Sequence, residues 1–157
     1  MNRTLLLVSA IGAGVSGGVF FAFSTFVMRG LGDIPAAQGA AAMQAINRAA
    51  PNPLFMLALF GTAVMGVIVG VIGLRDMSAL GAVYAVVGAG LYLIPVVLTV
   101  VYHVPYNNQL EALDAAAPAS ADFWTTYLSR WTAFNHLRCL GALGAAVSFA
   151  LAYRSAK

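Results

Sequence analysis

The chain has 157 residues, of which 61% are hydrophobic and only 8% are charged. A soluble domain of this length carries about a quarter charged residues, because its surface faces water. Five acidic and eight basic residues do not cover such a surface, which excludes a water-soluble globular domain and predicts lipid around most of the chain. The net charge of +3 comes from scattered residues without a lysine or arginine run, so nucleic acid is not expected as a partner.

Four apolar stretches reach the roughly 20 residues that a membrane-spanning helix requires. Lipid offers the backbone no hydrogen-bond partners, so each stretch is predicted to be a helix. We therefore expect an all-α integral membrane four-helix bundle, with residues 1–157 as a single domain and spans at about residues 5–28, 54–74, 80–103 and 131–153. Arg3 before the first stretch also fits a signal peptide, but the apolar run continues through Val27, beyond the usual length of such a segment.

The connections between the predicted spans differ in kind. Residues 75–78 form a tight turn, whereas residues 29–52 and 104–130 are long and polar. The first long connection is predicted to contain a short interfacial helix between Pro35 and Pro51, followed by Asn52 as N-cap and Pro53 as the first residue of the next helix. Both termini then share one side of the membrane with the tight turn. The basic residues divide equally between the two sides, so the positive-inside rule does not decide the orientation. We expect a bacterial inner membrane and cytoplasmic termini, because the arginines on the side opposite the termini are expected to serve the function of the protein.

Small residues recur at helix-packing spacing. Gly14 and Gly18 lie four residues apart, as do Gly66 and Gly70. Such pairs allow close approach of helix backbones, which is a main contribution to helix association in lipid. The pairs predict close packing, and lateral contacts of this kind also permit a homo-oligomer.

The beginning of the fourth span carries a stripe of large polar and amphipathic residues. At about 100° per residue they fall within about 60° of one another. They are Trp124, Tyr127, Trp131, Asn135 and Arg138. An arginine two turns inside an apolar run normally faces the bundle interior, which predicts a pocket. The alternative is an interfacial aromatic belt with a snorkelling arginine, which fits the two tryptophans but explains Asn135 less readily.

Both histidines are predicted at the same end of the bundle. His136 lies on the flank of the stripe, and His103 ends the third predicted span. Two histidines could take part in a copper, iron, heme or quinone site. No third histidine, partner cysteine or carboxylate within a span accompanies them, so we expect no dedicated metal site, and the pair remains an alternative.

Further polar residues could line the same pocket. The short helix between the first two spans supplies Met43, Gln44, Asn47 and Arg48, although a solvated helix face would explain them too. Asn107 and Asn108 follow the third span, and Ser24 lies near the end of the first.

Four segments in series resemble the anthrone oxygenase-like family, small four-helix membrane proteins that are mostly uncharacterised in bacteria. The segments are FFAFSTFVM (20–28), AAMQAINRAAPNPLF (41–55), VYHVPYNNQL (101–110) and WTTYLSRWTAFNHLR (124–138). His103 departs from the family pattern, in which asparagine often precedes Val-Pro. Fungal members are implicated in oxidising polyketide anthrones to anthraquinones with molecular oxygen.

The resemblance implies an oxygenase that acts on a lipophilic aromatic or phenolic compound without a cofactor, with O2 as co-substrate. Proton removal next to the ketone gives an enolate, which can itself pass an electron to O2. His136 is the expected base. Arg138, Asn135, Asn47 and Asn107 are the expected groups around the oxyanion. The expected substrate contacts are Trp124, Tyr127, Trp131, Phe134, Gln44, Met43 and Ser24.

Two other classes of function remain open at this point. One is a non-catalytic accessory subunit that buries its polar mouth against a partner. The other is a copper, iron, heme or quinone protein that uses His103 and His136. A transporter is the least expected, because no acidic residue lies within a predicted span.

Overall fold

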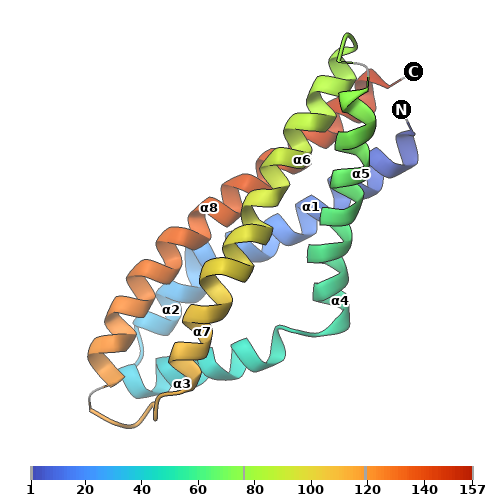
Figure 1. Ribbon diagram of the computed structural model, residues 1–157. Helices are drawn as coiled ribbons and strands as arrows, with labels where there is room; N and C mark the ends of the chain where they lie inside the picture. Colours follow the sequence, from blue (N-terminus) through green and yellow to red (C-terminus); the bar gives the residue numbers. More distant parts are fainter. Residues whose placement is uncertain (1, 76, 119, 157) are drawn as a thin grey trace.

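The computed structural model describes residues 2–75, 77–118 and 120–156, and these residues form helices and no strand. The described residues form four long helical rods and one shorter helix, α3 (Ala36–Ala49), which runs crosswise to them in Figure 1. The first rod consists of α1 (Arg3–Ala22), the π-helix η1 (Phe23–Val27) and α2 (Met28–Gly32), and the second of α4 (Pro53–Met56), the π-helix η2 (Leu57–Gly61) and α5 (Thr62–Leu74). The third rod consists of α6 (Leu80–Leu98), the π-helix η3 (Thr99–His103) and α7 (Val104–Glu111). The fourth rod is the single helix α8 (Ser120–Ser155). All four rods are long and apolar enough to cross a membrane, so the predicted all-α fold with four spans is confirmed.

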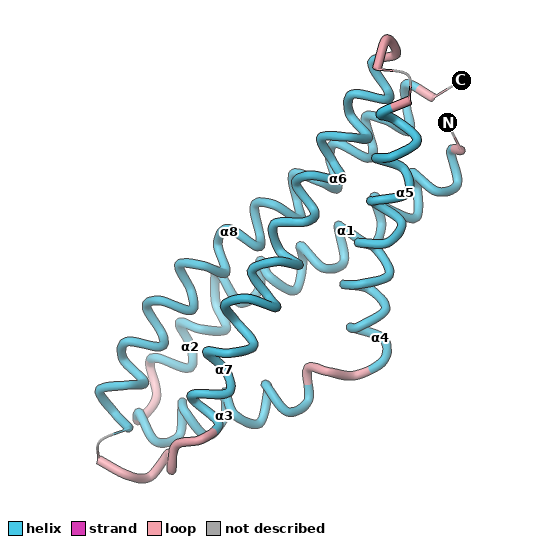
Figure 2. Tube along the Cα trace, in the orientation of Figure 1, coloured by secondary structure: helices cyan, strands magenta, loops and turns pink. Residues whose placement is uncertain are grey.

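The rods place the connections as predicted. Both termini and the turn between α5 and α6 lie at one end, while α3 and the connection from α7 to α8 lie at the other (Figure 2). Helix α8 packs against α1 and α6, and α5 packs against α6. The predicted capping before the second span is also confirmed, because Asn52 Oδ1 accepts a hydrogen bond of 3.0 Å from Phe55 N and Pro53 opens the helix.

Two of the helices extend beyond the predicted spans. The third rod does not end at His103 but continues through α7 to Glu111, and the fourth begins at Ser120 instead of Trp131. The polar connection therefore shrinks from residues 104–130 to residues 112–119. Pro105 explains part of the difference, because proline lacks an N–H and normally breaks a helix. Here the wide π-turn η3 comes directly before α7, and such a turn already interrupts the regular hydrogen-bond ladder.

Only one of the two predicted glycine pairs, Gly66 and Gly70, lies where two helices approach each other closely. A Cβ on Gly70 would lie 2.7 Å from Ala89 Cβ, and one on Gly66 would lie 3.3 Å from Phe149 Cζ. These glycines therefore allow α5 to pack against α6 and α8, as predicted. Gly14 and Gly18 have no such neighbour within 4 Å, so their pair makes no packing contact among the described residues.

Two of the three π-turns coincide with hydrogen bonds between rods, and the third coincides with a hydrogen bond within its own rod. A wide turn breaks the i→i−4 ladder and exposes carbonyls to other partners. Asn135 Nδ2 donates to Phe20 O beside η1 at 2.8 Å, and Tyr92 Oη donates to Leu59 O in η2 at 3.2 Å. In η3, His103 Nδ1 lies 3.1 Å from Leu98 O of its own rod. Each irregular turn is thus held by a buried polar side chain.

Candidate functional site

A cavity of about 630 Å³ opens at the end of the bundle that α3 covers. Residues of α1, η1, α3, α4, η3, α7 and α8 line it. Much of its wall is apolar, with Phe20, Phe23, Ile46, Phe55, Met56 and Trp131 among the lining residues. A mainly apolar hollow of this volume with a few polar groups is typical of sites for small organic molecules.

The predicted stripe on α8 faces this interior. Trp124, Tyr127, Trp131, Asn135 and Arg138 are each at most 6% exposed. Trp131 and Arg138 line the cavity itself. The alternative of a snorkelling arginine is therefore wrong for Arg138.

Arg138 is a buried cation without a carboxylate partner. Its Nη1 donates to Thr99 Oγ1 at 3.2 Å and its Nη2 to Asn135 Oδ1 at 2.8 Å, while Nε has no hydrogen-bond partner. The guanidinium carbon lies 4.6 Å from the ring centre of Phe20 and 4.9 Å from that of Trp131. Neutral dipoles and ring faces thus stabilise the charge, and none of the described residues forms an ion pair with it.

Asn135 holds the guanidinium in place. Its Nδ2 donates to Phe20 O and to Ser24 Oγ, both at 2.8 Å, which leaves Oδ1 to accept from Arg138. Ser24 therefore supports the site through Asn135. It does not line the cavity but a separate groove formed by residues of η1, α2 and α8, here called the outer groove.

A second hydrogen-bonded group lies on the α7 side of the cavity. Asn107 Oδ1 accepts from Tyr127 Oη at 2.7 Å and from Trp131 Nε1 at 2.9 Å. Asn47 Nδ2 lies 3.5 Å from Tyr127 Oη, at the long limit for a hydrogen bond. Asn47, Asn107 and Met43 line the cavity.

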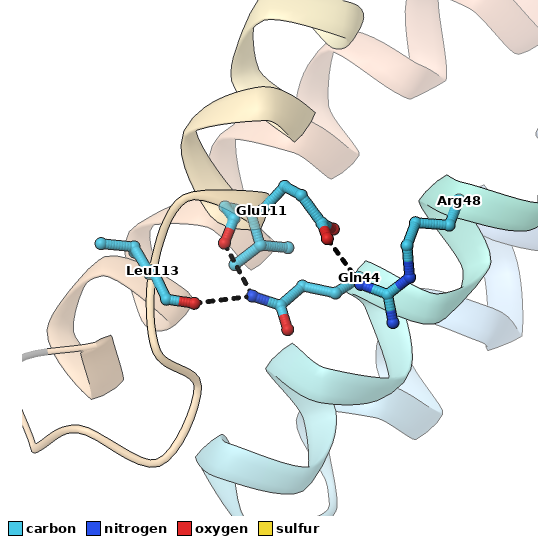
Figure 3. Close-up of polar contacts among 5 residues, drawn as sticks. Gln44, Arg48, Glu111 and Leu113 are labelled. Atoms are coloured by element: carbon cyan, nitrogen blue, oxygen red, sulfur yellow. Dashed lines mark hydrogen bonds and ion pairs between the residues drawn. The ribbon is translucent and has the colours of Figure 1, made fainter.

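Short hydrogen bonds join α3 to the end of α7 at the mouth of the cavity (Figure 3). Gln44 Nε2 donates to Leu110 O and Leu113 O, both at 2.9 Å, and Arg48 Nη1 forms a 2.6 Å ion pair with Glu111 Oε1. Arg48 and Glu111 line the cavity, whereas Gln44, a predicted substrate contact, is directed to one carbonyl near the end of α7 and one just beyond it.

The structure places three other predicted residues outside the cavity. His136 is exposed and lines the outer groove with Arg29 and Ser24, because the stripe that faces inward turns the flank of α8 outward. Phe134 is 36% exposed and stacks on Tyr102 with ring centres 3.9 Å apart. Trp124 is buried against Gly39 of α3 and does not line the cavity.

The two histidines do not come together. His103 is buried in the cavity wall, where Nδ1 lies 3.1 Å from Leu98 O and Nε2 lies 3.4 Å from Trp131 O. The described residues contain no group of three or more histidine, cysteine or acidic side chains that could hold a metal ion. The geometry thus does not assemble a metal site from His103 and His136.

Thr99 and Phe20 are site residues that sequence reasoning did not select. The spacing of one helical turn predicts that Thr99 shares a face with His103, but this alone did not mark it as a site residue. Phe20 could not have been recognised, because its role depends on the carbonyl and the ring that it presents to α8.

Comparisons with known proteins agree with the sequence resemblance. Residues 53–148 match the family described as Anthrone oxygenase, and this range contains Asn107, Asn135 and Arg138. No curated protein and no solved structure matches the chain. Because the family match covers well over half of the 157 residues, the chain belongs to the anthrone oxygenase family.

Proposed function

We propose that this protein is a membrane-embedded oxygenase that binds a lipophilic, anthrone-like aromatic ketone in the cavity and oxidises it with O2. The observation that carries the proposal is Arg138, a buried guanidinium in an apolar cavity that no carboxylate of the described residues neutralises. A buried charge is costly unless it is paired. A ligand that becomes an anion in the cavity would supply the missing charge.

The surroundings of Arg138 favour the enolate form of such a ligand. Electrostatic interactions are stronger in an apolar, water-poor site than in water. The guanidinium therefore stabilises the enolate oxygen more than the neutral ketone, which makes the ligand a stronger acid when it is bound. Phe20 and Trp131 offer ring surfaces beside the guanidinium, where a flat ligand can pack.

The oxidation balances without an external reductant. Loss of a proton from the CH2 group conjugated with the ketone gives the enolate, which passes one electron to O2. Recombination of the resulting radicals forms a C–O bond and, with a proton, a hydroperoxide. Cleavage of the O–O bond with loss of the second C–H proton releases water and leaves a new carbonyl. In sum, CH2 and O2 become C=O and H2O, and the four electrons lost by carbon reduce O2.

The proton acceptor must reach the cavity. The expected base, His136, is exposed on the outer groove, and both ring nitrogens of His103 face backbone carbonyls. Glu111 is the only carboxylate among the described residues that line the cavity. We therefore assign the proton acceptor to Glu111, at the mouth, where the proton can pass to water.

The test is oxygen consumption by the purified protein in lipid nanodiscs with anthrone as substrate. Arg138→Met should reduce kcat/KM by about 10²- to 10³-fold, the typical effect of removing an oxyanion donor. Arg130→Met is the matched control, because Arg130 is exposed on the same helix and does not line the cavity. Retention of the rate in Arg138→Met would contradict the proposal.

The same preparation separates the other classes of function. A visible absorption band or a stoichiometric metal would favour a heme, quinone or metal protein, and tight copurification with a second subunit would favour an accessory role. The bacterial inner membrane and cytoplasmic termini remain part of the proposal, and reporter fusions at the two termini would test the orientation.

A further inference from the structure

The side-chain amide of Asn107 has a fixed orientation. Its Oδ1 accepts from Trp131 Nε1 at 2.9 Å and from Tyr127 Oη at 2.7 Å. An indole N–H only donates, so the atom that it meets must be the amide oxygen and not the nitrogen. The two bonds occupy both lone pairs of that oxygen, so a flipped amide would face Trp131 with a second donor.

The fixed orientation leaves a donor without a protein partner. Nδ2 of Asn107 makes no hydrogen bond to any residue that the structure describes, although Asn107 lines the cavity. Asn135 is the opposite case, because its Nδ2 donates to two protein oxygens. Asn135 is therefore fully used within the protein, whereas the amide nitrogen of Asn107 is available to a ligand.

The guanidinium of Arg138 and the amide of Asn107 flank one aromatic ring of the cavity wall. The Arg138 guanidinium lies 4.9 Å from the ring centre of Trp131, and Asn107 is bonded to the indole nitrogen of the same ring. A flat ligand beside Trp131 would thus meet a cation near the face of the ring and an amide donor near its edge.

We infer that Asn107 is a second substrate-binding donor, and that the substrate carries two oxygen functions. The ionisable oxygen is held by Arg138, and a second oxygen, a carbonyl or ring hydroxyl, accepts from Asn107 Nδ2. Tyr127 and Trp131 are positioning residues for this amide. The inference rests on the proposed function, since it concerns the same cavity, and it adds the number and kind of oxygen atoms that the site recognises.

The experiment compares anthrone, which has one oxygen, with 1,8-dihydroxyanthrone, which has three, in binding and in kcat/KM. The wild-type protein should prefer the dihydroxy compound by about tenfold, the typical effect of one hydrogen bond. Asn107→Leu should abolish this preference and change the constants for anthrone much less. Gln109→Leu, a change at an exposed amide outside the cavity, should keep the preference. Tyr127→Phe should lower it in part, because Trp131 still holds the amide oxygen.

The ratio between the two ligands separates a binding role from a structural one. If Asn107 only supports Trp131 and Tyr127, its loss weakens both ligands equally and the ratio stays unchanged, which would overturn the inference. That result would leave the proposed function intact if Arg138→Met still abolished turnover of anthrone. Failure of the wild-type protein to bind either compound would overturn both.

Discussion

Two buried polar clusters lie within the same bundle and differ in how completely their hydrogen bonds are satisfied. Tyr92 is 1% exposed, and its hydroxyl meets Ser16 Oγ at 2.8 Å, Leu59 O at 3.2 Å and Ala58 O at 3.3 Å. That cluster carries no charge and does not line the cavity. Arg138 is almost as deeply buried, but it carries a charge, lacks a partner for Nε and borders the cavity.

In an apolar protein, the completeness of its hydrogen bonds can distinguish a structural polar group from a polar group that binds a ligand. Burial of a polar group costs free energy unless hydrogen bonds replace those of water. Around Tyr92 the protein provides these bonds itself, so the cluster joins α1, η2 and α6. Around Arg138 the compensation among the described residues is incomplete, and we propose that a ligand supplies the remainder.

Giving Arg138 an internal counter-ion should have the largest effect. Thr99→Asp places a carboxylate at the position that now accepts from Arg138 Nη1. The carboxylate then competes with an anionic ligand, so kcat/KM for anthrone should fall by about 10²-fold or more. The control variant Thr99→Asn introduces a side chain of the same size as aspartate but without its charge. It should change kcat/KM for anthrone by less than about tenfold. Equal losses in both variants would show that charge is not what the site requires.

Removing the carboxylate at the mouth should have the next largest effect on catalysis. Glu111→Gln should lower kcat by about 10²-fold, the low end for a general base, with little change in ligand affinity. Arg48→Gln breaks the same ion pair but keeps the carboxylate, and His136→Gln changes only the outer groove, so both should retain most activity. Loss of turnover in His136→Gln alone would restore that residue as the candidate base.

Removing the hydrogen bonds around Tyr92 should lower the stability of the protein and leave turnover unchanged. Tyr92→Phe leaves Ser16 and the carbonyls of η2 without the phenol, at a cost of about 1–2 kcal/mol. We expect a lower Tm in detergent and an unchanged kcat/KM at temperatures where the variant is folded. A loss of activity without a change in Tm would mean that this cluster also serves the site.

The smallest effects should come from the contacts between α3 and α7. Gln44→Leu removes the donor to Leu110 O and Leu113 O and should cost about 1 kcal/mol. Arg48→Gln should cost less, because an ion pair between exposed side chains contributes little. Amide hydrogen exchange across residues 104–113 would rank the two variants. A larger loss of protection in Arg48→Gln than in Gln44→Leu would show that the ion pair is the main contact between α3 and α7.

The parts of the fold that follow from local patterns could be predicted from the sequence. Apolar length predicted the spans, Asn52 and Pro53 predicted the start of α4, and helical periodicity predicted that Arg138 and Asn135 share an inward face. These features depend on properties of neighbouring residues along one chain segment, so periodicity and composition suffice for them.

The remaining features depend on contacts between rods. The π-turns, including the one that precedes Pro105, could not be predicted from local propensity. Periodicity placed His136 about 100° from Asn135, but it did not say whether another helix covers that flank. The unused donor of Asn107 likewise depends on Trp131 and Tyr127, which follow it by about twenty residues.

The length of α8 has a consequence for how reaction rates should be measured. Its 36 residues span about 54 Å, whereas the hydrocarbon layer is about 30 Å thick. Tyr153, which packs against the Arg3 guanidinium, and Arg154 are residues expected at one membrane surface. Counting about 20 residues back reaches Ala133, so Arg138 lies roughly 8 Å below the opposite surface.

A ligand dissolved in the bilayer can therefore lie level with Arg138. An anthrone and O2 both dissolve better in lipid than in water. The quantity that governs saturation should therefore be the mole fraction of substrate in the membrane, and adding empty vesicles at a constant total substrate concentration should slow the reaction.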